Sequence, residues 1–146
     1  MTTIVYDHKN KQVACDSRET ADGLLVTDEA RKYYKRTEVT WFICGTKADA
    51  DIFIDNFEHN TESPANLECS GLFVEGGVVY KACIADGVYK KDLLPSNEGL
   101  GSGGWTALAA VDLGKTAKEA VEFAMIRDIY SGGKIHVYDI GKSEFI

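Results

Sequence analysis

Apolar and β-branched residues form short runs in the first third of the chain, and polar turns separate them. The runs Thr3–Asp7 and Gln12–Asp16 flank a four-residue polar turn and predict an N-terminal hairpin. Leu24–Thr27 and Val39–Cys44 predict two further strands. Ala48–Phe57 instead carries its apolar residues at helical spacing, which predicts a helix after these strands.

Strands and helices also separate in the second half of the chain. Three short strands are predicted between Gly-Gly and Asp-Gly turns, at Gly71–Glu75, Val78–Ile84 and Gly87–Tyr89. Two helices and a final strand follow, at Trp105–Leu113, Ala117–Tyr130 and Lys134–Ile140. Gly114 ends the first helix, and a Thr116/Glu119 capping box opens the second. This order predicts an α+β fold and no Rossmann sheet.

Length and charge narrow the class of protein. The chain has 146 residues and no repeat or linker, so we predict a single domain over residues 1–146. Its 16 Lys and Arg against 23 Asp and Glu give a net charge of −7, which disfavours nucleic acid and anionic membranes as partners. No stretch approaches a membrane span and the N-terminus does not resemble a signal peptide, so we predict a cytoplasmic protein.

Most candidate motifs have ordinary structural explanations. The four cysteines are widely spaced without a CxxC pair, which indicates reduced structural cysteines. None of the three histidines forms an HExxH motif, so no metal site is predicted. The segment Gly99–Gly104 matches GxGxxG, but Pro95-Ser96-Asn97 precedes it and no acidic residue follows at the required offset. We therefore discard a dinucleotide site.

The start of the chain carries a stronger candidate for chemistry. Met1 precedes a small residue, so its removal would leave Thr2 with a free α-amine. That amine, with an ordinary pKa of about 7.7–8.0, is able to act as general base toward the hydroxyl of the same residue. A retained Met1 would acylate the amine and abolish this base.

Six segments occur in order along the chain: TTIV at Thr2–Val5, VACDSRET at Val13–Thr20, ARK at Ala30–Lys32, CGTKAD at Cys44–Asp49, GSGG around Ser102 and RDIYSGG at Arg127–Gly133. Together they resemble the proteasome β-subunit family, and the bacterial HslV proteases are similar in the TTIV start and the GSGG loop. The resemblance implies a four-layer αββα sandwich of the N-terminal-nucleophile hydrolase type. The polar stretch 58–66 is too short for the family's second long helix, so we expect a reduced helical layer.

The resemblance also implies catalytic roles. Thr2 resembles the nucleophile, with Asp16 and Lys32 as the buried pair beside it. Gly45 resembles the glycine whose backbone N–H stabilises the oxyanion. Ser102, Asp128 and Ser131 resemble the group around the threonine amine, and Arg18 resembles a brace for Asp16. The expected substrate pocket contains Glu19, Ala30, Ile43 and Lys47; Lys47 stands where the family often has a small residue.

We therefore predict a threonine-type endopeptidase that cleaves peptide or protein substrates through an acyl-enzyme, without a cofactor. The resemblance implies a homo-oligomer, with an ATP-dependent unfoldase as a candidate partner. Two alternatives remain open: a noncatalytic proteasome-like assembly or scaffold protein, and a small-molecule amidase of the same fold. Ser102 with Gly103, and Asp128 with Ser131, could also serve only to cap helices.

Overall fold

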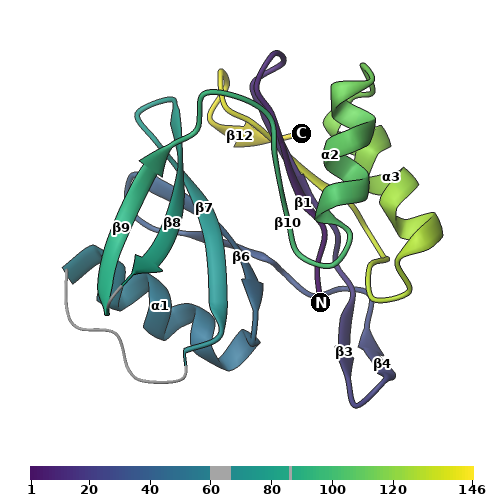
Figure 1. Cartoon of the computed structure of the whole chain (residues 1–146), viewed down its shortest axis with the longest axis horizontal. Coiled ribbons are helices and arrows are strands. Elements are labelled where there is room, and N and C mark those ends of the chain that lie inside the picture. The colour runs from purple at the N-terminus through teal and green to yellow at the C-terminus, as the bar shows by residue number, and fades with distance from the viewer. Residues whose placement is uncertain (60–66, 86) are drawn as a thin grey trace. The chain divides into compact units, whose positions relative to one another are not determined.

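The computed structural model describes residues 1–59, 67–85 and 87–146, which form two compact units. Unit 1 contains Met1–Lys32 and Pro95–Ile146, and unit 2 contains Tyr33–Leu94. Each unit consists of an antiparallel sheet with helical cover, and the α+β class is confirmed (Figure 1). The single domain over 1–146 stays a prediction.

Unit 1 is built on a five-stranded sheet in the order β10-β1-β2-β11-β12. Its strands are β1 (Ile4–Asp7), β2 (Gln12–Cys15), β10 (Glu98–Leu100), β11 (His136–Asp139) and β12 (Glu144–Phe145). The predicted N-terminal hairpin is the β1–β2 pair. A separate two-stranded hairpin of unit 1 joins β3 (Glu19–Ala21) and β4 (Leu24–Thr27). All neighbouring strands pair antiparallel.

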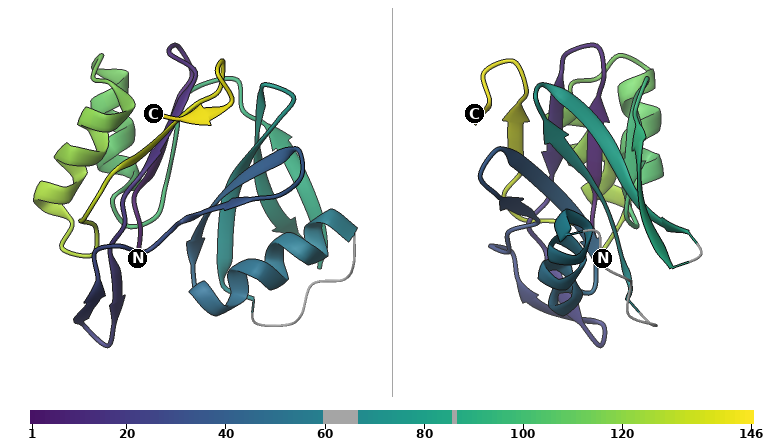
Figure 2. Two further views of the ribbon diagram at one scale, coloured as in Figure 1. Left: turned by 180° about the vertical axis from the view of Figure 1, so that it is seen from behind. Right: turned by 90° about the vertical axis from the view of Figure 1, so that its left-hand side faces the viewer.

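Helices α2 (Gly104–Asp112) and α3 (Ala117–Arg127) cover one face of this sheet (Figures 1 and 2). Val5, Ala14 and Val137 lie opposite one another in register and present one apolar stripe to the helices. The helices meet that stripe with alanines, whose small side chains allow close packing. The Thr116/Glu119 capping box forms as predicted and fixes the start of α3.

Unit 2 is a five-stranded sheet in the order β5-β6-β7-β8-β9. Its elements are β5 (Tyr33–Lys35), β6 (Val39–Gly45), α1 (Lys47–His59), β7 (Cys69–Glu75), β8 (Val78–Ala85) and β9 (Val88–Leu93). Helix α1 packs on the sheet through Ala50 and Phe53, which meet Trp41 and Phe73 in an aromatic core. The sequence predicted that the stretch 58–66 is too short for a second long helix, and most of this stretch, residues 60–66, lies outside the described residues.

Two expectations are wrong in detail. Helix α3 ends at Arg127 rather than Tyr130, because Asp128 adopts an extended conformation and its side chain accepts a hydrogen bond from the Tyr130 N–H. The segment Gly99–Gly104 does begin inside a strand, since β10 includes Gly99 and Leu100. That strand pairs antiparallel with β1, so the segment lies in no βαβ unit, and the dinucleotide interpretation stays discarded.

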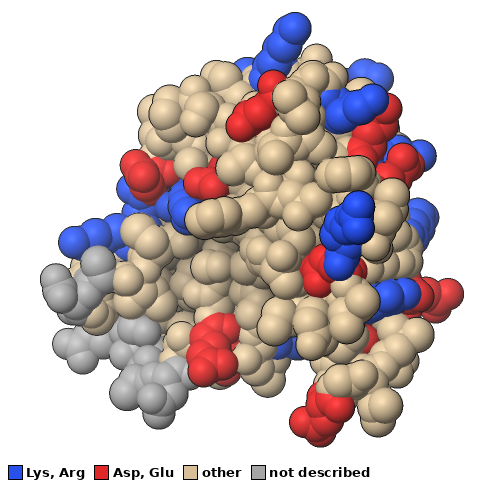
Figure 3. Space-filling model, turned by 45° about the vertical axis from the view of Figure 1, so that its right-hand side comes forward, with Lys and Arg blue, Asp and Glu red and all other residues tan. Residues whose placement is uncertain are grey.

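Charged side chains of both signs are interspersed on the face drawn in Figure 3. Among the described residues, no helix is long and apolar enough to cross a membrane.

Candidate active site

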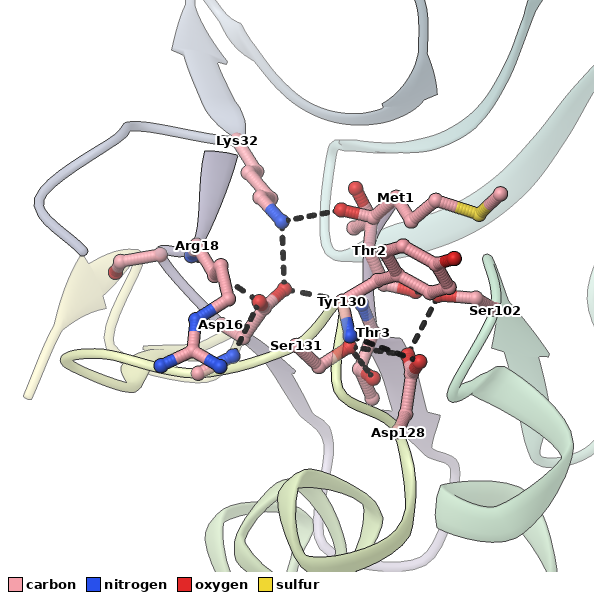
Figure 4. A network of polar contacts seen from close by, with 12 residues as sticks. Met1, Thr2, Thr3, Asp16, Arg18, Lys32, Ser102, Asp128, Tyr130 and Ser131 are labelled. Carbon is pink, nitrogen blue, oxygen red and sulfur yellow. Dashed lines mark hydrogen bonds and ion pairs between the residues drawn. The ribbon is translucent and has the colours of Figure 1, made fainter. Parts of the chain in front are cut away.

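The N-terminal segment of unit 1 lies where loops from three parts of the chain converge (Figure 4). Thr2 and Thr3 precede β1, and the pairing of β1 with β2 brings Asp16 beside them. Ser102 comes from the turn between β10 and α2. Asp128 and Ser131 follow α3. Ser102 and Thr2, 100 positions apart in sequence, therefore lie in contact.

The Asp16 carboxylate is the centre of the first polar network. Its side chain is fully buried and accepts four hydrogen bonds. Oδ1 accepts from the Thr3 N–H at 3.0 Å and from Lys32 Nζ at 2.9 Å. Oδ2 accepts from the Arg18 N–H at 3.2 Å and the Gly132 N–H at 3.0 Å. A buried carboxylate needs this full set of donors.

Lys32 is also buried, with 7% of the residue exposed. Besides its ion pair with Asp16, its ammonium donates to the Met1 carbonyl oxygen at 2.8 Å. This oxygen belongs to the peptide group that joins Met1 to Thr2, so the nitrogen of Thr2 is an amide in this structure. The buried charge thus lies directly beside the backbone of the predicted nucleophile.

Thr2 is 3% exposed and its carbonyl oxygen accepts from the Gly103 N–H at 3.2 Å. The Ser102 hydroxyl lies 3.4 Å from the same oxygen. Close approach requires glycine: at Gly101, where φ is +87°, an added Cβ would lie 2.0 Å from the Thr2 oxygen. The GSGG segment is therefore explained by its contact with the start of the chain.

A second polar network surrounds Asp128. Its Oδ2 accepts from the Ser102 hydroxyl at 2.5 Å and from the Ser131 hydroxyl at 2.6 Å, and its Oδ1 accepts from the Tyr130 N–H at 3.1 Å. Burial would raise the pKa of Asp128, but these hydrogen bonds and the positive N-terminus outweigh it, so its pKa is lowered. Asp128 is thereby kept ionised beside the N-terminus of the chain.

Thr3 connects the two networks, and the sequence analysis did not single it out. Its N–H donates to Asp16, and its hydroxyl lies 2.7 Å from the Ser131 hydroxyl. Because the Ser131 proton goes to Asp128, the Thr3 hydroxyl is the donor in this contact. Its place next to Thr2 in TTIV was the only signal in the sequence.

Arg18 contacts the same region through its backbone and side chain. Its N–H donates to Asp16, and its guanidinium pairs with Asp28, a residue that no motif indicated. The hydrogen bond to Asp28 raises the pKa of Arg18 above its ordinary value. Arg18 thus contacts Asp16 through its backbone N–H, and its bracing role stays a prediction.

The predicted pocket residues lie in both units. Glu19 in β3 and Ala30 are half-buried in unit 1, and the Ala30 N–H donates to the Ser17 carbonyl. Ile43 packs in the core of unit 2, and Lys47 begins α1. Gly45 ends β6 with φ at +118°, and an added Cβ would lie 2.2 Å from the Glu68 carbonyl oxygen. Their roles toward substrate stay predictions.

Metal binding has no evident place in the part of the chain that the structure describes. There, no group of three or more His, Cys, Asp or Glu side chains is arranged to hold a metal ion. Cys15 is fully buried beside Asp16, and burial raises the pKa of its thiol to about 12, which keeps it protonated. The polar clusters at the start of the chain consist of threonine, lysine, aspartate and serine side chains.

The fold of the chain is similar to that of a solved HslV structure. The crystal structure of eukaryotic HslV from Trypanosoma brucei matches it with a TM-score of 0.73 and 20% sequence identity. The match covers 93% of this chain and 97% of that chain. The resemblance expected from the sequence motifs is thus confirmed at the level of the fold. No family model and no curated protein matches the sequence.

Proposed function

We propose that the chain is a threonine-type peptidase that acts through an N-terminal Thr2 exposed by removal of Met1. The observation that carries this proposal is the placement of Thr2 between two polar networks, the Asp16–Lys32 pair and the Asp128–Ser102–Ser131 cluster. Helix capping alone would not require that both clusters contact the first three residues. The HslV-like fold supports the same conclusion.

In the proposed reaction, the Thr2 hydroxyl attacks the amide carbon of a peptide while the free α-amine takes its proton. The Lys32 ammonium, which Asp16 holds in an ion pair of 2.9 Å, lowers the free energy of the developing alkoxide. The amine then passes the proton to the leaving amine, and an acyl-threonine ester remains. Water attacks the ester with the same amine as base, which releases the acid and restores Thr2.

We assign to the Asp128 cluster the role of favouring proton transfer to and from the Thr2 α-amine, the proposed base. After removal of Met1, the Asp128 carboxylate would lie near the Thr2 α-amine through Ser102, where it would help the protonated amine to form and to return its proton in each half-reaction. We assign oxyanion stabilisation to the Gly45 N–H, and the substrate pocket to Glu19, Ala30, Ile43 and Lys47. These assignments, and the four-layer αββα sandwich with a reduced helical layer, rest on the family resemblance.

Assembly and location belong to the same proposal. The family resemblance of the sequence motifs supports a homo-oligomer, with an ATP-dependent unfoldase as a candidate partner and peptide or protein as substrate. We keep the cytoplasm as the proposed location and no organic cofactor as the expectation. None of these points is needed for the chemistry at Thr2.

One contact favours a second candidate, a noncatalytic assembly protein of the same fold. Lys32 donates to the Met1 carbonyl, so the polar site accommodates a chain that keeps Met1. In that form the Thr2 nitrogen is an amide and cannot act as base. The two candidates therefore differ in whether Met1 is removed.

Intact mass spectrometry distinguishes them. Freshly expressed protein is weighed before and after incubation with a peptide epoxyketone, which reacts with both the hydroxyl and the free amine of an N-terminal threonine. The peptidase requires loss of Met1 followed by a single adduct. The matched control is Thr2→Ala, which also permits Met1 removal but offers no hydroxyl, and should stay unlabelled.

Each outcome assigns the function. A single adduct in the wild type, together with peptide hydrolysis that Thr2→Ala lacks, supports the peptidase. Loss of Met1 with neither adduct nor hydrolysis would reject it. Retained Met1 without hydrolysis would favour the assembly protein, and undiminished hydrolysis by Thr2→Ala would end the threonine mechanism altogether.

A further inference from the structure

Arg18 and Asp28 form a two-point pair on the surface of unit 1. Arg18 Nε donates to Asp28 Oδ1 at 2.8 Å, and Nη2 donates to Oδ2 at 3.1 Å. Parallel bonds of this kind fix the plane of the guanidinium as well as its position. Asp28 directly follows β4 and belongs to none of the segments that resemble the protease family.

The guanidinium also contacts the loop that follows α3. Its Nη1 donates to the Ile129 carbonyl oxygen at 3.1 Å. It lies against the α-carbon of Gly132, where an added Cβ would be 2.5 Å from Arg18 Cζ. At Gly133, an added Cβ would be 2.3 Å from the Asp28 carbonyl oxygen. The loop therefore packs directly against both members of the pair.

This same loop carries two of the proposed catalytic groups. Asp128 stands at its start, and Ser131 joins Asp128 to Thr3. Next to Ser131, the Gly132 N–H donates to Asp16, and the Gly132 carbonyl accepts from the Ser17 N–H at 2.9 Å. A shift of the loop would move the Asp128 cluster relative to Asp16 and to the start of the chain.

We propose that Asp28 is a positioning residue that, by clamping the Arg18 guanidinium against residues 129–132, sets the distance of Asp128 and Ser131 from Thr2. An arginine side chain without a fixed partner samples many rotamers, and the paired carboxylate selects the one that reaches the loop. The lowered pKa of Asp28, caused by its hydrogen bond from Arg18, agrees with this pairing. The catalytic consequence rests on the proposed peptidase function, whereas the clamp itself does not.

The test combines a structural readout with a chemical one. Hydrogen exchange, resolved to the segment 128–133, is measured on the full chain for wild type, Asp28→Ala, Arg18→Ala and the double variant. The rate of labelling by the peptide epoxyketone is measured on the same proteins across pH. Glu29→Ala, which removes the neighbouring exposed carboxylate, is the matched control, and Asp28→Glu tests rescue by a longer carboxylate.

We expect exchange of the Gly132 amide to rise about fivefold in Asp28→Ala, the effect of losing a partly exposed ion pair. Arg18→Ala should match it, and the double variant should add nothing further, because both changes release the same clamp. Labelling should slow by a similar factor and its pH profile should shift, because Asp128 has moved from the amine. Glu29→Ala should match wild type, and Asp28→Glu should recover most of the protection.

Unchanged exchange at 128–133 in Asp28→Ala would overturn the clamp. So would faster exchange spread evenly over α2 and α3, since that reports general destabilisation. If exchange at 128–133 rises in Asp28→Ala as expected but the pH profile of labelling does not shift, the positioning role would be overturned. A wild-type protein that takes up no label would reject the peptidase function, while the exchange data would still decide the clamp.

Discussion

The buried pair Asp16–Lys32 permits a quantitative test of how the site is held together. In Asp16→Asn, one amide oxygen replaces two carboxylate oxygens that accept four hydrogen bonds, and the Lys32 ammonium stays buried without its counter-charge. Removing one partner of a buried pair destabilises a protein by about 3–5 kcal/mol. Lys32→Met leaves the opposite charge unpaired and is expected to have a loss of the same size.

The double variant separates the pair from its surroundings. It removes both charges together, so its loss should be about 2–3 kcal/mol smaller than the sum of the single losses. Equilibrium urea unfolding at pH 7, followed by circular dichroism, measures all four free energies. The control cycle is Arg36→Met with Asp51→Asn, a pair whose atoms lie 3.2 Å apart with side chains 30% and 71% exposed. Its coupling should be below about 1 kcal/mol.

The result that would refute this reasoning is additivity. If the single losses at Asp16 and Lys32 sum to the double loss within about 0.5 kcal/mol, the two charges do not depend on each other in the folded state. A coupling no larger than that of the exposed control would mean that burial adds nothing to the pair. Either finding would also weaken the proposed role of Asp16 in holding the Lys32 ammonium beside Thr2.

Three further outcomes are expected. Gly103→Ala should destabilise by about 1–3 kcal/mol, because its Cβ would lie 2.0 Å from Thr3 Oγ1; Gly141→Ala, whose nearest contact would be at 3.4 Å, should leave the melting temperature nearly unchanged. The pKa of Asp128 is lowered in the folded state, so its contribution to stability is present above an unfolded pKa of about 3.9 and is lost as pH falls through the lower folded value. The urea midpoint should therefore fall less steeply with decreasing pH in Asp128→Asn than in wild type. Equal slopes in the two proteins would refute this. Thr116→Ala should lower stability by about 1 kcal/mol through loss of the α3 cap, and an unchanged midpoint would contradict the cap's role.

Elements whose own residues signal a strand or a helix were predictable from the sequence. Val39–Cys44 and Leu24–Thr27 are strands as expected, because their β-branched and apolar residues suit a sheet. The α2 and α3 helices were predicted through the residues at their ends, Gly114 after the first and the Thr116/Glu119 capping box at the start of the second. In these segments local preference and tertiary packing agree.

Short strands were missed because their pairing depends on distant partners. The strand β10 has three residues, and its register is set by β1, more than 90 positions earlier. Two-residue β12 is defined only by its pairing with β11. No pattern within two or three residues encodes such contacts. The end of α3 was misplaced for a related reason, because the Asp128 side chain bonds its own loop and stops the helix.

The site residues were identified by motif, but their contacts were not. Nothing in the spacing of Asp16 and Gly132 along the sequence reveals that the Gly132 N–H donates a hydrogen bond to the Asp16 carboxylate. Asp28 gave no signal, since an aspartate after a strand is an ordinary surface residue. Such residues become visible only when the fold brings their partners together.

The contacts around Thr2 also explain how one site could serve a chain with and without Met1. Both peptide groups flanking Thr2 are fixed: Lys32 holds the Met1 carbonyl, Gly103 holds the Thr2 carbonyl, and Asp16 holds the Thr3 N–H. Removal of Met1 would leave the last two contacts in place, so the backbone of Thr2 would keep its position. The Lys32 ammonium would then lose a carbonyl acceptor beside Thr2. A buried ammonium needs its donors satisfied, and the Thr2 hydroxyl and its alkoxide are suitable acceptors there. Under the proposed function, maturation therefore redirects an existing charge toward the nucleophile and requires no new structure.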